Sequence, residues 1–566
     1  MRDRPIDPAY SFDVIVIGSG MAGSVVAGRC AESGLKVLVL EKGDHPRWQG
    51  RKKGILARVL STYDDGAGER WPTAVLVRKQ EGQRYRESKA AVGIGPGGSA
   101  RLYGAALGRA ARIDFERDFQ PPQWPEPYRD GAALLNAWPV AYDEFLAAYR
   151  EAERLLAPLG TRDPLDPDDD ALLGPPPRIS PAHEALVARL ADNGRHPFRM
   201  HVGIAYKPGC SECQGNTCPR DCKAHGFNRV LEPAMAKAAP VTLETTATVQ
   251  TIERAAGGRW TVRGKNAAGE PVAFQAGKVV LAAGALNTPR LLEASAAIWD
   301  GAVPPLVGRG LMFHTNDMFA VENPEGLSFH GPRKVLAFRD HYLDGDLPLA
   351  ECQSLGMVAS PALIAVHLYR AMQQRGLGLG VFGKLAMRPI GQIGYRIYEG
   401  SEMFAAPLQD LPYADNRVTT VLDAEGHERI AITYRPRKEL IARVKRLRQL
   451  VSEAFAPLKV RFPTAVGQPN YGHPMGTCRM GSAPDHSVVD ARGQVWDCPG
   501  LYVADASAFP SSLGINPALT VAAHAIRVAE ALVADAGAGS GQVQLDTPPR
   551  EDTSPTGSVA ASTAAS

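Results

Sequence analysis

Residues 12–43 read FDVIVIGSGMAGSVVAGRCAESGLKVLVLEKG, and this stretch decides the fold. The β-branched run 12–17 predicts a buried parallel strand, and a helix of small residues starts inside the glycine-rich turn that follows. In that turn Gly18 permits the tight bend, Gly20 lets the backbone approach a pyrophosphate, and Gly23 lets the helix and strand pack closely. The pattern G-x-G-x-x-G between a strand and a helix therefore predicts a dinucleotide-binding βαβ unit.

The start of the helix and the end of the second strand complete the predicted dinucleotide site. Met21 and Ala22 open the helix, whose first N–H groups are unpaired and carry a partial positive charge that suits phosphates. Residues 37–40 predict the second strand, and Glu41 follows it, 21 residues after Gly20. An acidic side chain at that distance accepts hydrogen bonds from ribose hydroxyls and disfavours a 2′-phosphate. The motif alone does not separate NAD from FAD.

The composition is ordinary for a globular protein and argues against some function classes. The chain has 566 residues, enough for two or three domains, and its 63 Lys and Arg residues nearly balance 60 Asp and Glu residues. This balance argues against a nucleic-acid or membrane-surface partner. No run reaches the roughly 18 to 20 consecutive apolar residues of a membrane helix, and residues 1–12 lack the apolar core of a secretory signal. We therefore expect a cytoplasmic protein, exported only if a partner subunit carries it.

The order of the predicted elements indicates the fold class. Strands and helices alternate at the front of the chain and meander-like strands appear later, which predicts an α/β nucleotide-binding core with an added sheet domain. Residues 537–566 contain almost no large apolar side chain and are predicted to form a disordered tail. Further strands are predicted at 241–243, 249–252, 260–263 and 279–282, and helices at 142–156, 182–193, 437–455 and 520–534.

Seven further segments occur in the order typical of one family. They are GIGPGGSARLYGAALGR (93–109), WPVAYDEFLAAYREAE (138–153), VVLAAGALNTPRLLEAS (279–295), VGRGLMFH (307–314), LPYADNRVT (411–419), GHPMGTCRMG (472–481) and LYVADASAFPSSLGINPALTVAAHAIRVAEAL (501–532). On these segments the chain, from about residue 12 to about residue 535, resembles the glucose–methanol–choline (GMC) flavin oxidoreductases. The resemblance implies FAD rather than NAD.

The resemblance also implies an α/β architecture in which a Rossmann-type FAD-binding domain is interleaved with an α+β substrate-binding domain. The implied FAD-binding segments are 10–155, 226–318 and 463–536. A connection with a cysteine-rich part spans 156–225, and the substrate-binding domain spans 319–462.

The segments that the resemblance assigns to FAD also suit it chemically. Residues 93–98 contain four glycines and a proline, which suits close contact with a flat ring. Members of the family with covalent FAD often use a histidine in this segment, and residues 96–102 contain none, so the resemblance implies non-covalent FAD. Beyond the opening unit, the implied cofactor residues are Gly97, Gly98, Ser99, Tyr103, Gly104, Val249, Ala283, Gly284, Asp505, Ala506, Asn516 and Pro517.

Alcohol oxidation on a flavin needs a base for the hydroxyl proton and a group that holds the substrate oxygen. A base that works near neutral pH favours histidine, and a carboxamide can donate one hydrogen bond and accept another. By resemblance, His473 takes the position of the base and Asn516 that of the second group. Asn516 could also cap the last helix. His314 is a candidate of second rank, with a structural role as the alternative.

Four of the eight cysteines lie at positions 210, 213, 218 and 222. Three explanations remain open: thiolate ligands of zinc or of an iron–sulfur cluster, local disulfides, or reduced structural thiols. Cys213, Cys218 and Cys222 match the C-x4-C-x3-C pattern on which some sugar dehydrogenases of the family carry a 3Fe-4S cluster, whereas Cys210 departs from it. Those enzymes usually travel with a small subunit and a cytochrome, so the cluster interpretation implies such partners here.

The sequence therefore predicts an FAD-dependent alcohol oxidase or dehydrogenase. By analogy with cysteine-rich relatives, we expect a sugar-like or polyhydroxylated substrate, and oxygen, a quinone or a redox protein as the electron acceptor. The alternatives are lyase or decarboxylase chemistry on the same flavin scaffold, oxidation of an aliphatic, aryl or steroid alcohol, and a flavoprotein that binds without turnover.

Overall fold

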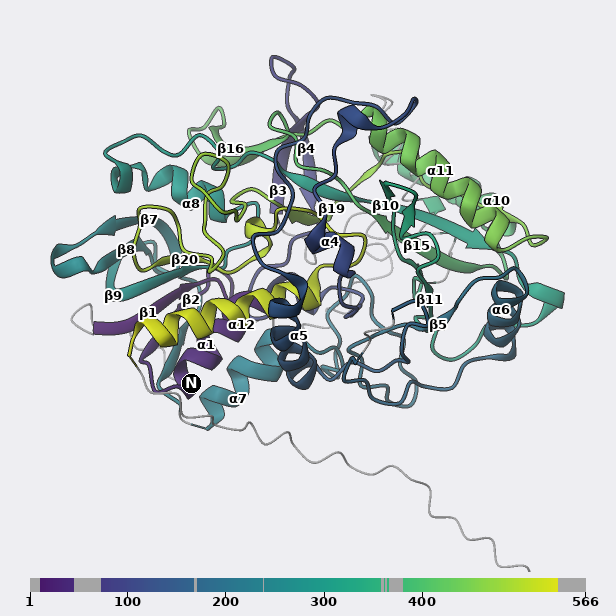
Figure 1. Ribbon diagram of the computed structural model, residues 1–566, viewed down its shortest axis with the longest axis horizontal. Helices are drawn as coiled ribbons and strands as arrows, with labels where there is room; N and C mark the ends of the chain where they lie inside the picture. Colours follow the sequence, from purple (N-terminus) through teal and green to yellow (C-terminus); the bar gives the residue numbers. More distant parts are fainter. Residues whose placement is uncertain are drawn as a thin grey trace, which may run out of the picture.

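The computed structural model describes residues 11–44, 73–166, 170–237, 239–357, 361, 364–365 and 380–537. The strands of these residues form two seven-stranded sheets, a four-stranded sheet and a two-stranded ribbon, with helices packed around them (Figure 1). The predicted α/β class is confirmed: a Rossmann-like layer adjoins a second, antiparallel sheet. Apart from Gly537, the predicted tail lies outside the described residues.

The first sheet is built on the opening βαβ unit. Its strands β6, β2, β1 and β9 run parallel to their neighbours, β20 lies parallel to the end of β9, and β7 and β8 form an antiparallel edge. Because the parallel strands share one direction, their carboxyl ends meet at one edge, where ligands of such sheets bind. The strands are β1 (Ser11–Ile17), β2 (Val37–Leu40), β6 (Val241–Glu244), β7 (Thr248–Arg254), β8 (Trp260–Lys265), β9 (Pro271–Leu281) and β20 (Leu501–Val503).

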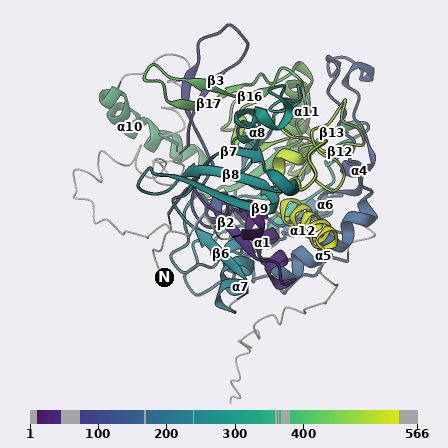
Figure 2. The ribbon, with the colours of Figure 1, turned by 90° about the vertical axis from the view of Figure 1, so that its left-hand side faces the viewer.

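Helices from three distant parts of the chain pack together beside this sheet. α1 (Met21–Glu32), α5 (Tyr142–Leu156) and α12 (Ala518–Asp535) lie side by side, as Figures 1 and 2 both show. α1 is buried over most of its length, because its small residues let neighbouring elements approach closely. The short helices α7 (Glu232–Ala236) and α8 (Thr288–Ala294) lie before β6 and after β9.

The second sheet is antiparallel and lies beside the first. Phe319 and Phe404 from its strands form one core with Leu440 and Val444 of α11 (Lys438–Ala454) and with Leu186 of α6 (Pro181–Asp192). The strands are β5 (Phe198–Arg199), β10 (Met312–Val321), β11 (Leu336–Phe338), β14 (Cys352–Ser354), β15 (Glu402–Leu408), β18 (Val460–Arg461) and β19 (Pro469–Met475).

The second sheet extends beyond the predicted substrate segment 319–462 on both sides. β10 begins at Met312 and β19 reaches Met475, because these two strands pair with each other across the sequence. The segment that carries His473, predicted to be part of the FAD-binding domain, contributes strand β19 to the second sheet.

The remaining elements connect the two layers. The four-stranded sheet comprises β16 (Arg417–Leu422), β17 (Glu428–Thr433), β3 (Thr73–Arg78) and β4 (Arg86–Ala90), and the ribbon comprises β12 (Leu343–Asp344) and β13 (Leu347–Pro348). α4 (Arg112–Glu116) and α10 (Gly380–Tyr398) are further helices. In the part of the chain that the structure describes, no helix is both long and apolar enough to cross a membrane.

Candidate active site

A cavity of about 1780 Å³ lies where the carboxyl edge of the first sheet meets the second sheet. Pockets for a single drug-sized ligand enclose about 300–1,000 Å³, so this cavity can hold a dinucleotide and a further small molecule. We call the two parts the first-sheet end and the second-sheet end. The second-sheet end is lined by Tyr103, Gly104, Gln214, Gly215, Asn316, Met318, Lys334, Gln353, Leu355, Met357, Ala405, Asn470, Gly472, His473 and Asn516.

Glycines shape the first-sheet end. Gly18 has φ 102°, and a Cβ at this position would lie 2.5 Å from the carbonyl oxygen of Ala282. A Cβ on Gly23 would lie 1.8 Å from the carbonyl oxygen of Gly18, so both glycines are required by packing, as predicted. Gly20 and Gly284 differ, since a Cβ at either would meet no atom within 4 Å. Their backbones are open to a ligand.

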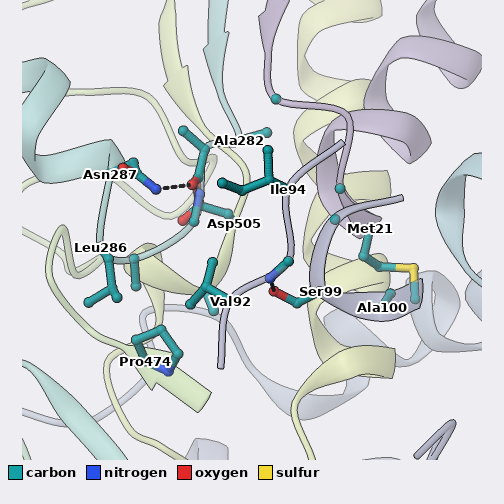
Figure 3. A pocket seen from close by; sticks show the side chains of 18 of the residues that line it. Met21, Val92, Ile94, Ser99, Ala100, Ala282, Leu286, Asn287, Pro474 and Asp505 are labelled. Atoms are coloured by element: carbon teal, nitrogen blue, oxygen red, sulfur yellow. Dashed lines mark hydrogen bonds between the residues drawn. The ribbon is translucent and has the colours of Figure 1, made fainter. Parts of the chain in front are cut away.

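The start of α1 faces this open space. Figure 3 shows Met21, at the start of the helix, across the cavity from Ala282 and Asp505 at the ends of β9 and β20. Gly20 is the N-cap and offers no side chain to the first N–H groups of the helix. Unpaired N–H groups at a helix start bind phosphates, so the residues at this end fit the diphosphate of FAD.

Two carboxylates at the first-sheet end hold its loops together. Glu41 accepts hydrogen bonds from Ser19 N and Oγ at 3.0 and 2.7 Å, from Gly43 N at 2.9 Å and from Gly95 N at 3.1 Å. It therefore joins three loops, and its contact with a ribose stays a prediction.

The second carboxylate is Asp505. It accepts from Gly284 N at 2.8 Å, Thr288 Oγ1 at 2.6 Å and Ser507 N at 2.8 Å, which fixes the turn after β9 against the start of α8. Burial raises the pKa of this carboxyl, whereas the hydrogen bonds oppose that rise.

Most of the predicted cofactor residues border the cavity. Gly23 does not border it, because it packs against Gly18. Gly97 does not border it either; it has φ 88° and lies beside Arg101. The residues that line it are Gly18, Gly20, Met21, Ala22, Glu41, Gly98, Ser99, Tyr103, Gly104, Val249, Ala283, Gly284, Asp505, Ala506, Asn516 and Pro517.

His473 lies on β19 and meets His314 of β10. In the pairing of these strands, Met312 lies opposite Met475 and Phe313 lies opposite Pro474. The two histidines follow these pairs, at the point where the register between β10 and β19 shifts. Their Nδ1 atoms are 3.0 Å apart. Sequence reasoning ranked His314 second, because nothing in a single strand shows which distant strand will pair with it.

Hydrogen bonds to carbonyl groups determine which nitrogen of each ring carries a proton. Nε2 of His314 lies 2.7 Å from the carbonyl oxygen of Ser512 and 3.1 Å from that of Leu513, so this nitrogen must donate. Burial lowers the pKa of His314 to about 4, so the ring is neutral and its Nδ1 accepts. The proton between the rings therefore lies on Nδ1 of His473.

The same reasoning leaves Nε2 of His473 without a proton. Burial, then electrostatic interactions with His314 and Lys334, lower the pKa of His473 to about 3, so its ring is neutral at neutral pH. Its Nδ1–H points to buried His314, and the bare Nε2 is the nitrogen that remains for the cavity. An unprotonated imidazole nitrogen is able to take a proton from a hydroxyl group.

Asn516 also borders the cavity and lies just before α12. The N-cap of α12 is Pro517, and Asn516 does not cap the helix. Its Oδ1 accepts a hydrogen bond from Nε2 of Gln353 on β14, which leaves the Nδ2 amino group free to donate. His473 and Asn516 thus border one cavity from the two different layers.

Several residues of the second-sheet end were missed by sequence reasoning. Lys334, Gln214, Gln353, Asn316 and Asn470 border the cavity, although they lie outside the residues that the motifs pointed to. A buried lysine beside a histidine is a strong signal for a site, but it becomes visible only once the strands are assembled.

The cysteine segment forms a loop behind this end of the cavity. Cys210, Cys213, Cys218 and Cys222 surround a small cavity of about 220 Å³, and all are free thiols. Within the described chain no three of their sulfur atoms lie within 4.8 Å of one another, whereas zinc with bonds of about 2.3 Å needs its ligands closer. The four thiols form no disulfide in the described residues, and their geometry supports neither the zinc nor the iron–sulfur explanation.

The similarity of this chain to known proteins is consistent with the geometry of the cavity. The sequence profile of the GMC oxidoreductase family matches residues 176–316 and 412–525, and that of an NAD(P)-binding Rossmann-like domain matches residues 16–53. 6‴-Hydroxyparomomycin C oxidase of Streptomyces lividus is 27% identical over 551 residues, with 92% of this chain and 91% of that protein covered. Paromamine 6′-oxidase of Streptomyces fradiae is 27% identical over 565 residues, with 93% and 92% covered.

A solved structure shows the same fold. Pyridoxine 4-oxidase from Mesorbium loti aligns with a TM-score of 0.56 at 18% identity, over 92% of this chain and 99% of that chain. The two GMC matches include β9, which ends at the first-sheet end, and β19, which carries His473, so both ends of the cavity are bordered by matched segments. In these two segments the chain matches GMC oxidoreductases, and this match supports an FAD-dependent oxidoreductase that acts on CH–OH groups with the help of an electron acceptor. Neither these matches nor the relatives' names point to an iron–sulfur cluster, a small subunit or a cytochrome.

Proposed function

We propose that the protein oxidises a hydroxyl group of a polyhydroxylated, sugar-like alcohol to a carbonyl group, with non-covalent FAD and with dioxygen as the electron acceptor. The observation that carries the proposal is the bare Nε2 of His473, fixed by the contact of its Nδ1 with His314. FAD, when bound, supplies the acceptor for the hydride that leaves the substrate carbon.

The residues of the chain perform the other parts of the reaction. Nε2 of His473 takes the hydroxyl proton as general base. Nδ2 of Asn516 donates a hydrogen bond to the substrate oxygen and stabilises the negative charge that develops there. His314 holds the ring of His473 in the competent tautomer and accepts its Nδ1–H throughout, and Gln353 orients the carboxamide of Asn516.

The lining of the second-sheet end supports a polyhydroxylated substrate. Five carboxamide side chains border it, and each can donate to or accept from hydroxyl groups. Aryl or steroid alcohols would leave several of these amides without partners, which is costly wherever the ligand displaces water from them. The five residues are Gln214, Asn316, Gln353, Asn470 and Asn516.

Dioxygen is proposed as the acceptor because the two relatives from Streptomyces are named as oxidases. Non-covalent binding is proposed because residues 96–102 contain no histidine. Denaturation should therefore release the flavin into the supernatant.

A series of polyols mixed anaerobically with the FAD-loaded protein tests the proposal. We expect at least one polyol to bleach the flavin absorbance and to yield one equivalent of carbonyl product per flavin. Readmitted oxygen should restore the colour and release peroxide. A series without any bleaching would contradict alcohol oxidation, and bleaching without peroxide would contradict dioxygen as the acceptor.

A further inference from the structure

The second-sheet end of the cavity is bordered by a largely buried lysine whose ammonium group has no partner among the described residues. Lys334 lies just before β11, is 4% exposed and borders the cavity. Its Nζ makes no hydrogen bond or ion pair with any residue that the structure describes; only its backbone N–H is paired, with Glu212. Buried lysines are nearly always paired, so an unpaired one beside a cavity points to a ligand.

The side chain of Lys334 extends along the cavity wall. A Cβ on Gly356 would lie 3.1 Å from the Cβ of Lys334, and a Cβ on Gly104 would lie 2.7 Å from its Nζ. The side chain of Lys334 therefore extends from Gly356 to Gly104. Gly104 itself borders the cavity beside Gln214. The ammonium group is close enough to His473 for its charge to lower the pKa of that ring.

The carboxylates near Lys334 already have other hydrogen-bond or ion-pair partners. Glu212 accepts from Tyr206 OH at 2.7 Å and from the backbone N–H of Arg333 and Lys334. Neither Glu212 nor the other nearby carboxylate borders the large cavity.

That other carboxylate, Glu351, pairs with Arg339 at 2.9 Å. The neighbouring cation Lys223 donates to the carbonyl oxygens of Tyr103, Cys213 and Asn216, so it does not compete for a ligand. Among the cations that the structure describes, Lys334 is therefore the one that borders the second-sheet end beside His473.

The rest of the second-sheet end carries no compensating charge. Among the described lining residues, the other charged side chains come from the first sheet and its connections or from the four-stranded sheet. They are Glu41, Lys42, Arg263, Arg290, Glu428 and Asp505. A substrate in the second-sheet end therefore meets one positive charge, five carboxamides and a neutral imidazole.

We propose that Lys334 binds the carboxylate of the substrate, so that the enzyme acts on polyhydroxylated acids of the sugar-acid type. This inference rests on the proposed alcohol oxidation and names the substrate class for it. A carboxylate matches the single positive charge, and the carboxamides bind the hydroxyl groups. An alcohol with an ammonium group in the same place is repelled, because two like charges would share a site of low dielectric.

Three compounds with the same carbon chain test this inference: gluconate, neutral glucitol and cationic glucamine. Their binding to the FAD-loaded enzyme is measured by anaerobic calorimetry, which needs no turnover. We expect gluconate to bind about tenfold or more tighter than glucitol, as a hydrogen bond to a charged group allows, and glucamine to bind more weakly than glucitol.

Lys334→Met should abolish the preference for gluconate and leave the affinity for glucitol within about twofold, and Lys334→Arg should retain part of the preference. Burial lowers the pKa of Lys334 to about 8, while Glu212 and Glu351 oppose this shift. Lys334 is charged below that pH, so gluconate affinity should fall as the pH rises above about 8, and glucitol affinity should not.

Equal affinity for gluconate and glucitol, or an unchanged preference in Lys334→Met, would overturn the inference. Tighter binding of glucitol 6-phosphate than of gluconate would overturn the choice of a carboxylate. These results are independent of the proposed function, whose failure appears as an absence of flavin bleaching with every polyol.

Discussion

The Nδ1 atoms of His314 and His473 lie 3.0 Å apart, and the other nitrogen of His314 donates to the carbonyl groups of Ser512 and Leu513. Leu513 has φ 65°, a left-handed conformation that is uncommon for leucine. Strained backbone of this kind is typical of functional sites. The chain thus holds a buried turn in a costly conformation next to the histidine that fixes the tautomer of His473.

His314→Leu should slow flavin reduction by at least about tenfold, because the ring of His473 loses the acceptor that orients it. His314→Gln keeps an acceptor oxygen and should recover most of the rate. Stopped-flow reduction of the FAD-loaded variants measures both rates. A purely structural role would instead reduce FAD retention and rate alike in both variants, and equal rates for the two would contradict the positioning role.

The pH dependence of flavin reduction should lack the usual inflection of histidine. His473 acts in its unprotonated form, and burial together with His314 and Lys334 lowers its pKa to about 3. The rate should therefore stay level from about pH 8 down to about pH 5, and fall only as the pH approaches the shifted value. Reduction by neutral glucitol is the suitable reaction. A loss of half the rate near pH 6.5 would show an ordinary, solvated histidine.

A buried ion pair in α11 should contribute strongly to the stability of the second sheet. Arg443 and Glu439 of α11 are both 0% exposed, and Arg443 Nη1 also donates to the carbonyl oxygens of Pro348 and Gln409 at 2.7 Å each. Arg443→Met leaves the Glu439 carboxylate buried without its cation, which should lower the free energy of unfolding by about 3–5 kcal/mol.

The matched control for this pair is the double variant Glu439→Leu with Arg443→Met. It removes both charges and should be less destabilised than Arg443→Met alone, as measured by urea unfolding. A double variant that is as unstable as the single one would show that the charge itself is unimportant.

Cys218 should be the most reactive thiol of the cysteine loop. Burial opposes its ionisation, but hydrogen bonds from the backbone of Cys222 and Arg220 and from the thiols of Cys222 and Cys213 lower its pKa. Burial raises the pKa of the neighbouring Cys222 to about 11. Iodoacetamide followed by peptide mapping should find Cys218 alkylated before Cys222. Preferential labelling of Cys222 would contradict this order.

The elements with strong local signals were predictable from the sequence. The opening strand, the glycine turn and α1 agree within one residue, and the predicted helix 142–156 coincides with α5, because apolar periodicity and turn residues specify them locally. The second sheet was only foreseen in outline. Strands such as β5 and β18 have two residues each, too few for a pattern, and form because longer neighbours pair with them.

The residues of the site likewise divide into those that local motifs predict and those that only strand pairing brings to the cavity. The glycines, Glu41 and Asp505 stand in motifs, so their place beside the cavity was predictable. Lys334 and Gln353 are ordinary polar residues in sequence, and their burial follows from β11 and β14 pairing within the second sheet. His314 becomes interpretable only through the pairing of β10 with β19, 159 residues apart at the two histidines.

The most direct test of the account is the rate at which a reactive polyol reduces the flavin of His473→Ala under anaerobic conditions. His427→Ala is the control, since His427 is 76% exposed and is not among the residues that line the cavity. If His473 is the general base, its alanine variant should retain FAD and yet reduce it about a hundredfold or more slowly, while the control keeps the native rate. Near-native reduction in His473→Ala with FAD retained would contradict the account.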